Sequence, residues 1–238
     1  MSDDMGYSDL GCFGGEIQTP NLDALADAGI RFTNFYSENM CWVSRASMLT
    51  GVYHRASFKD GSLHPHCLTL PESLKAQGYR TGIMGKWHLG GYPDQRGFDY
   101  FYGILGGASS FFAPIGLKRN RTAIDHEFQD KEDYYFTHAI GKEAISFLQK
   151  SRVDQPFFLY LPFTAAHWPL HAPEDAIERY QGKFSAGWDE LRKKRLQKMK
   201  ALGVMDQSVK LSPRHPKVPS WKDEKHKTWQ ERRMEVYA

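Results

Sequence analysis

A helix followed by an apolar strand is the pattern that most constrains how this chain folds, because the pattern occurs three times. Pro20 at a first helical position and Gly29 as a stop predict a short helix, and residues 30–36 follow it as a strand. Such units are typical of folds in which helices cover a sheet.

Two further units follow the first. Thr69 and Glu72 have capping-box spacing at the start of a helix, and residues 79–84 are the strand after it. Thr137 opens a third helix, and residues 156–161 form a continuous apolar run of the kind that is buried on both faces of a sheet. The third helix has one apolar face, made of Ile140, Ala144, Phe147 and Leu148. We therefore predict the α/β class, with a largely parallel central sheet flanked by helices.

The length of 238 residues, with 41% hydrophobic and 14% aromatic residues, is enough for one core. Residues 174–238 differ from the rest: their helical patterns are rich in charge, and residues 212–219 hold three prolines. The basic run 192–195 alternates with leucines at helical spacing, so we interpret it as a solvated helix face rather than a nucleic-acid site. We expect one domain over residues 1–238, with residues 174–238 as its peripheral helical subregion.

Both ends of the chain look cut. Asp3 and Asp4 have too few residues before them to form a strand, and the helical pattern of residues 223–238 stops without a capping residue. We therefore expect a sheet that is incomplete at both ends.

Charge and composition give no support to several classes of protein. Lys and Arg number 31 against 28 Asp and Glu, so a net charge of +3 gives no support to a nucleic-acid partner. The sequence has no apolar stretch of the ~20 residues that a membrane span needs and no signal-peptide pattern. Three widely spaced cysteines predict neither a disulfide framework nor a Cys-x-x-Cys site.

The adjacent carboxylates of Asp3 and Asp4 precede Gly6 and suit a hard cation such as Ca²⁺ in preference to Mg²⁺. A solvated acidic pair is the alternative. Cys41 stands at the start of a predicted short helix, where amide groups and the helix dipole favour an anion, and Arg45 lies one turn later. A buried structural cysteine is the alternative here.

Lys86 and His88 follow the strand 79–84 and, if extended, share one face, while Trp87 points to the other. His167 likewise falls just past the apolar run 156–161. Functional groups of α/β sheets lie beyond the carboxyl ends of strands, so these residues are expected to meet. Cations, a nucleophile at a helix start and two histidines together indicate a pocket for a tetrahedral dianion.

These motifs carry a family resemblance. The chain resembles the arylsulfatase-type sulfatases of the alkaline phosphatase superfamily, through Cys41-x-x-Ser44-Arg45-x-x-x-Leu49-Thr50-Gly51, Asp3-Asp4-Met-Gly, Gly85-Lys86-Trp-His88-Leu-Gly, Thr19-Pro-Asn-Leu-Asp, Gln95-Arg-Gly-Phe-Asp and the segment at His167. The resemblance covers nearly the whole chain and is to the amino-terminal part of that family. It implies an alkaline phosphatase-like fold and the hydrolysis of a small-molecule or carbohydrate sulfate ester.

The resemblance also implies roles for single residues. Cys41 would be converted to formylglycine by a maturation enzyme, and Arg45 would stabilise the hydrated aldehyde. Asp3 and Asp4 would be Ca²⁺ ligands. Lys86 would bind the sulfate, His88 would help expel it, and His167 would assist the leaving alcohol.

Two alternatives to catalysis by this chain stay open. A truncated, inactive remnant is favoured by Val43, which stands where the family's modification signal has proline, and by the further ligands that the family takes from later segments. The second alternative is that the chain belongs to a hydrolase of phosphate or phosphonate esters from the same superfamily. The sequence predicts neither the oligomeric state nor the localisation. Export to the periplasm or out of the cell is an expectation that rests on the resemblance alone.

Overall fold

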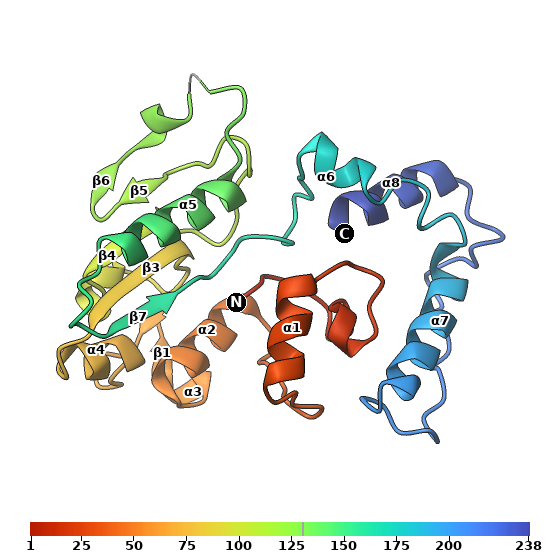
Figure 1. Ribbon diagram of the computed structural model, residues 1–238, viewed down its shortest axis with the longest axis horizontal. Helices are drawn as coiled ribbons and strands as arrows, with labels where there is room; N and C mark the ends of the chain where they lie inside the picture. The colour runs from red at the N-terminus through yellow and green to blue at the C-terminus, as the bar shows by residue number, and fades with distance from the viewer. Residues whose placement is uncertain (130) are drawn as a thin grey trace. The chain divides into compact units, whose positions relative to one another are not determined.

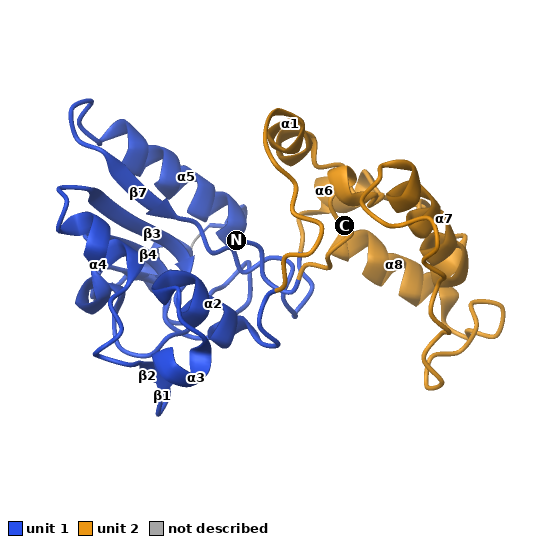
Figure 2. Cartoon of the chain, turned by 90° about the horizontal axis from the view of Figure 1, so that it is seen from below, with its two compact units in different colours: residues 1–4, 37–171 blue, residues 5–36, 172–238 orange. Residues whose placement is uncertain are grey.

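The computed structural model describes residues 1–129 and 131–238 and divides them into two compact units (Figure 2). Unit 1 comprises Met1–Asp4 and Ser37–His171, and unit 2 comprises Met5–Tyr36 and Ala172–Ala238. The prediction of one domain with a peripheral subregion stays a prediction.

Unit 1 holds all the strands that the described residues form. Its strands are β1 (Phe58–Lys59), β2 (Ser62–Leu63), β3 (Arg80–Lys86), β4 (Tyr100–Ile104), β5 (Lys118–Arg119), β6 (Thr122–Ala123) and β7 (Phe157–Tyr160). Its helices are α2 (Cys41–Thr50), α3 (His54–Ser57), α4 (Leu70–Lys75) and α5 (Phe136–Gln149), with short 3-10 turns η2 (Pro93–Arg96) and η3 (Asp125–Glu127).

The central sheet has the strand order β6-β5-β4-β3-β7. β3 is parallel to both β4 and β7, but β4, β5 and β6 pair antiparallel. The α/β class is confirmed, and the sheet is mixed rather than largely parallel. The reason is local: only two residues, Asn120 and Arg121, join β5 to β6, and so short a connection permits only an antiparallel hairpin.

Apolar side chains pack on both faces of the sheet. Ile83 and Met84 are adjacent in β3 and enter different clusters, as the alternation of a strand requires. Ile83 packs with α2, and Met84 packs with α5, which lies along the sheet in Figure 1. On α5 the predicted apolar face is buried at Ile140, Ala144 and Phe147, whereas Leu148 is 40% exposed.

Two strand predictions are wrong in part. Residues 30–36 form no strand, and Ile30 and Tyr36 are more than 80% exposed, because no strand among the described residues pairs with this segment. The run 156–161 does contain β7, but among the described strands β7 pairs only with β3, and Phe157 is 48% exposed. It is therefore an edge strand on the described sheet.

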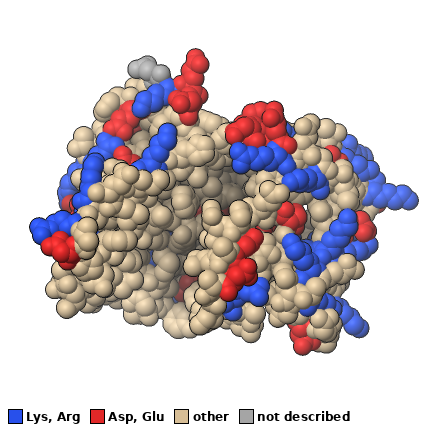
Figure 3. All heavy atoms as spheres, viewed as in Figure 1, with Lys and Arg blue, Asp and Glu red and all other residues tan. Residues whose placement is uncertain are grey.

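Unit 2 is helical. Its elements are η1 (Gly11–Phe13), α1 (Pro20–Ala28), α6 (Glu174–Glu178), α7 (Gly187–Ala201) and α8 (Lys227–Tyr237), and the last three match the charge-rich helical patterns of the sequence. Figure 3 shows Lys and Arg side chains interspersed with Asp and Glu over the surface where Figure 1 places α7 and α8. Among the described residues, no helix is long and apolar enough to cross a membrane.

Candidate active site

The candidate site lies in unit 1, where the parallel strands β3, β4 and β7 end. The chain that follows β7 also holds the first residues. The Asp3 N–H donates to the Ala165 carbonyl over 2.9 Å, and the Ala166 N–H donates to the Asp3 carbonyl over 2.8 Å. Asp3 is only 2% exposed. The sequence offered no strand to present Asp3, and the backbone of residues 165–166 presents it instead.

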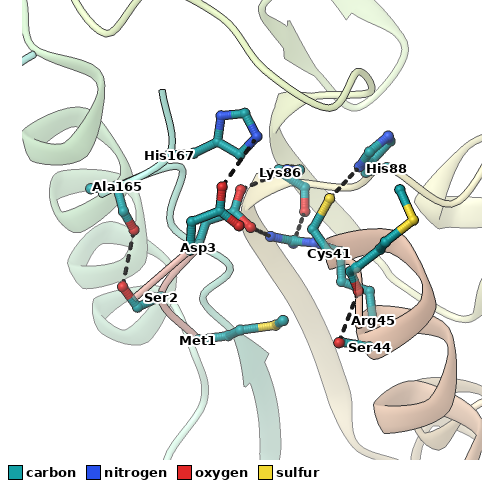
Figure 4. A network of polar contacts seen from close by, with 12 residues as sticks. Met1, Ser2, Asp3, Cys41, Ser44, Arg45, Lys86, His88, Ala165 and His167 are labelled. Atoms are coloured by element: carbon teal, nitrogen blue, oxygen red, sulfur yellow. Dashed lines mark hydrogen bonds and ion pairs between the residues drawn. The ribbon is translucent and has the colours of Figure 1, made fainter. Parts of the chain in front are cut away.

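One carboxylate faces two buried cations in this site (Figure 4). Asp3 Oδ2 lies 2.6 Å from Lys86 Nζ, and Asp3 Oδ1 lies 3.3 Å from Arg45 Nη2. Arg45 and Lys86 are both fully buried. Removing charges from water costs several kcal/mol per ion, so such a cluster persists only when the charges compensate one another. Here two positive groups share one carboxylate, which leaves the cluster positive.

Arg45 is held by hydrogen bonds from one of its three guanidinium nitrogens. Its Nη1 donates to the Lys86 carbonyl over 2.8 Å and to Tyr160 Oη over 3.5 Å. Within the described part of the chain, neither Nε nor Nη2 has a hydrogen-bond partner. The ion pair of Nη2 with Asp3 supplies charge without hydrogen-bond geometry. Buried donors of this kind are costly, and an anion bound beside them would satisfy them.

Cys41 is the first residue of α2, as the sequence predicted. Met40 precedes it in an extended conformation and provides no side-chain cap, so the first amides of the helix have no capping side chain. Cys41 Sγ lies 3.4 Å from His88 Nδ1 (Figure 4). Arg45 follows one turn later, which puts the thiol, the imidazole and the guanidinium in one region.

His88 has an unusual backbone conformation and a lowered pKa. Its φ of 56° lies in the left-handed region, so the extended conformation assumed for residues 86–88 does not reach this residue. Lys86 and Trp87 are nevertheless fully buried, with Trp87 in the apolar cluster. Burial lowers the pKa of His88 to about 4, helped by the positive charges of Lys86 and Arg45. The imidazole is therefore neutral at pH 7 and able to accept a proton.

Asp4 and His167 meet at the more exposed side of the site. His167 Nε2 lies 3.6 Å from Asp4 Oδ2, and the His167 Nδ1 contacts the Trp168 carbonyl. The carboxylates of Asp3 and Asp4 have the chemistry for a hard cation, but no group of three or more potential ligands was found within residues 1–129 and 131–238. Ca²⁺ takes six to eight oxygens, so these two carboxylates do not make a complete site by themselves.

The structure thus brings all seven predicted residues into one unit, through four contacts: Asp3 with Lys86, Asp3 with Arg45, Cys41 with His88, and Asp4 with His167. Sequence reasoning missed Tyr160, whose hydroxyl reaches Arg45 from the last residue of β7. Burial raises the pKa of Tyr160 to about 12, so it stays protonated. A tyrosine one residue before the end of the apolar run 156–161 was the available signal for a polar group at this end of the strand.

Comparisons with known proteins agree with the resemblance carried by the sequence motifs. A family model described as sulfatase matches residues 1–211. The chain is 34% identical to an uncharacterized sulfatase of Schizosaccharomyces pombe, over 100% of the chain and 50% of that protein. It is also 34% identical to an arylsulfatase of Klebsiella aerogenes, over 89% of the chain and 51% of that protein. The chain therefore spans about half the length of these relatives.

One matching solved structure is that of BT4656 in complex with D-glucosamine-2-N,6-O-disulfate. The match covers 77% of this chain and 37% of the BT4656 chain, with a TM-score of 0.67 and 30% sequence identity. The matching solved structures are sulfatases of the alkaline phosphatase-like fold, and this chain has a mixed central sheet flanked by helices. The sequence motifs, the fold and the family model agree: the chain belongs to the sulfatase family.

Proposed function

We propose that this chain carries the sulfate-binding and nucleophile-bearing part of an enzyme that hydrolyses sulfate esters. One observation supports this above the others: within the described part of the chain, the fully buried Arg45 has two donor groups without a hydrogen-bond partner, close to Lys86 and to the first residue of α2. A sulfate group presents three oxygens that such donors would bind. The positive balance of the cluster favours an anionic ester over a neutral one.

The nucleophile is proposed to be a formylglycine made from Cys41. This change is a two-electron oxidation of the Cβ carbon with replacement of sulfur by oxygen, and the maturation enzyme supplies the oxidant. Water adds to the aldehyde and gives a geminal diol. Arg45, one turn along α2, would hold that diol and the sulfate in line for attack.

The reaction then has two steps. One diol hydroxyl gives up its proton to water as its oxygen bonds to sulfur. The bond from sulfur to the alcohol oxygen breaks at the same time, and His167 gives the departing alcohol its proton. Neutral His88 next takes the proton of the remaining hydroxyl, the bond from Cβ to the sulfated oxygen breaks, and the aldehyde and free sulfate form. Readdition of water restores the diol, so each turnover consumes one water molecule.

Asp3 and Asp4 would contact the Ca²⁺ that the family resemblance implies, with further oxygens from outside this pair. A bound divalent cation would supply positive charge next to the sulfate oxygens. The substrate is proposed to be a carbohydrate or other small-molecule sulfate ester, since the matching solved structure, by its title, holds a sulfated glucosamine.

The test is to produce the chain together with a formylglycine-generating enzyme, to measure the mass of the peptide that contains Cys41, and to assay 4-nitrophenyl sulfate with 4-nitrophenyl phosphate alongside. We expect the aldehyde mass and preferential release of sulfate. A C41A variant is the matched control. Aldehyde without turnover of either ester would contradict catalysis by this chain, and faster phosphate release would favour a phosphate ester hydrolase.

A second possibility, a non-catalytic sulfatase relative, is favoured by Val43. This residue is 1% exposed in α2 and occupies the place of the family's signal proline. An unmodified thiol after coproduction with the maturation enzyme would support this possibility. Substitution of Val43 by proline is then expected to restore modification, because position 43 is in the first turn of α2, where proline is tolerated.

A further inference from the structure

One loop holds His88 from two directions. Residues 105–111 follow β4, and the Leu105 carbonyl accepts a hydrogen bond from the His88 N–H over 3.1 Å. The same loop meets the ring: a Cβ placed on Gly107 would lie 2.6 Å from His88 Cε1 and 2.7 Å from Nε2. Real Cβ atoms do not approach other atoms so closely, so the imidazole occupies the space that any side chain at position 107 would need.

We propose that Gly107 is a positioning residue for His88, and that the absence of a side chain at position 107 is what lets the imidazole lie against Cys41. The inference rests on the proposed function only in that His88 acts in the reaction. Gly107 itself has no side chain that could take part in the reaction. Its effect passes through the ring of His88, whose Nδ1 lies 3.4 Å from Cys41 Sγ.

The loop that faces the ring is held at both of its ends. At its far end Phe111 is 2% exposed, its N–H donates to His171 Nδ1 over 3.4 Å, and its carbonyl accepts from the Phe136 N–H over 2.7 Å. With both ends of the loop bonded, a methyl group at position 107 would displace the imidazole rather than the loop. His88 is also in the left-handed backbone region, which a non-glycine residue keeps only when its surroundings fix it.

The neighbouring glycine provides a matched control. Gly106 is exposed, and a Cβ built on it meets nothing within 4 Å. We expect G107A to lower the turnover of the matured enzyme about 100-fold, the scale of loss that misplacing a reacting group by about 1 Å produces. G106A is expected to stay within about threefold of the parent chain. Equal turnover in G107A and G106A would overturn the proposal.

A second measurement separates positioning from loss of folding and does not need activity. The groups that act on the charge of His88 are Lys86, Arg45, Asp3 and His167, and Cys41 lies in contact with it. NMR titration of the imidazole in the unmodified protein should give a pKa near 4 in the parent chain and in G106A. In G107A the displaced ring should titrate closer to the ordinary value of 6.5.

Turnover of the double variant completes the test. In an H88A background, G107A should cause no further loss, because its effect passes through a ring that is no longer there. A further loss would mean that Gly107 acts by another route. If the parent chain shows no turnover with any sulfate ester, the proposed function fails, and the NMR titration still decides whether Gly107 positions His88.

Discussion

At the scale of single residues, Asp3 is the carboxylate that pairs with both buried cations of the site. Replacing it by asparagine would leave the ammonium of Lys86 and the guanidinium of Arg45 buried without a counter-charge. Breaking a buried ion pair from one side costs about 3–5 kcal/mol. We therefore expect D3N to lower the free energy of unfolding by about that amount in a urea titration.

Asp154 provides the matched control for this substitution. Its ion pair with Arg152 is more than two-thirds exposed on both sides, and exposed pairs contribute little to stability. D154N should therefore leave the midpoint of the urea transition almost unchanged. A D3N protein as stable as D154N would mean that the cluster around Asp3 does not stabilise the fold.

His88 leads to a prediction about pH. Burial, Lys86 and Arg45 lower its pKa to about 4, whereas in the unfolded chain the pKa is near 6.5. As the pH falls, the unfolded chain binds this proton first. The stability that comes from the neutral ring is therefore complete above about pH 6.5 and is lost as the pH falls towards 4.

Comparison with H88Q isolates this contribution from that of the carboxylates. Between pH 6.5 and 4 the parent chain should lose more free energy of unfolding than H88Q does, as measured by urea titrations at a series of pH values. Parallel pH curves for the two proteins would contradict the lowered pKa.

At the scale of elements, α4 depends on the capping box that its sequence predicts. Thr69 Oγ1 accepts from the Glu72 N–H, and Glu72 Oε2 accepts from the Thr69 N–H over 2.7 Å. T69A removes the hydrogen bond from the Glu72 N–H to the Thr69 side chain, at a residue that is 1% exposed. We expect a loss of about 1 kcal/mol by thermal unfolding. T228A, on an exposed position of the first turn of α8, should cost less than half as much.

The elements that could be predicted from sequence are those with local signals. The cap of Thr69, the stop at Gly29 and the apolar face of α5 depend on neighbours within a few residues, and all three helices form. The strand predicted at residues 30–36 has an equally good local pattern, but a strand needs a partner for its backbone, and local sequence does not reveal whether one exists.

The site shows the same division between local and distant information. The positions of Cys41, Lys86 and His167 after a helix start or a strand end could be predicted, because the α/β rule fixes where such residues point. The ion pairs of Asp3 and the contact of Gly107 with His88 could not, since they join segments far apart in the sequence and depend on atomic distances.

At the scale of the whole molecule, unit 2 is built from two stretches of chain, residues 5–36 and 172–238, and a polar cluster joins them. Asp9, 5% exposed, accepts a hydrogen bond from Arg195 Nη1 over 2.7 Å and another from the Tyr237 hydroxyl. Arg195 also pairs with Glu16. The carboxylate of Asp9 is thus the point where α7 and α8 both contact the amino-terminal stretch.

Removal of Arg195 should therefore loosen unit 2 and leave the packing within unit 1 intact. R195A deprives Asp9 of its only ion pair among the described residues, and we expect a cost of about 2 kcal/mol, below the range for fully buried pairs because Arg195 is one-quarter exposed. Hydrogen exchange resolved by peptide should quicken in residues 5–36 and 172–238 but not in β3 or α5. D175N breaks an exposed ion pair with Arg179 in the same unit. It should change neither the stability nor the exchange rates of these segments. Equal acceleration in both units would mean that they unfold together, and that the cluster around Asp9 stabilises the chain as one cooperative body.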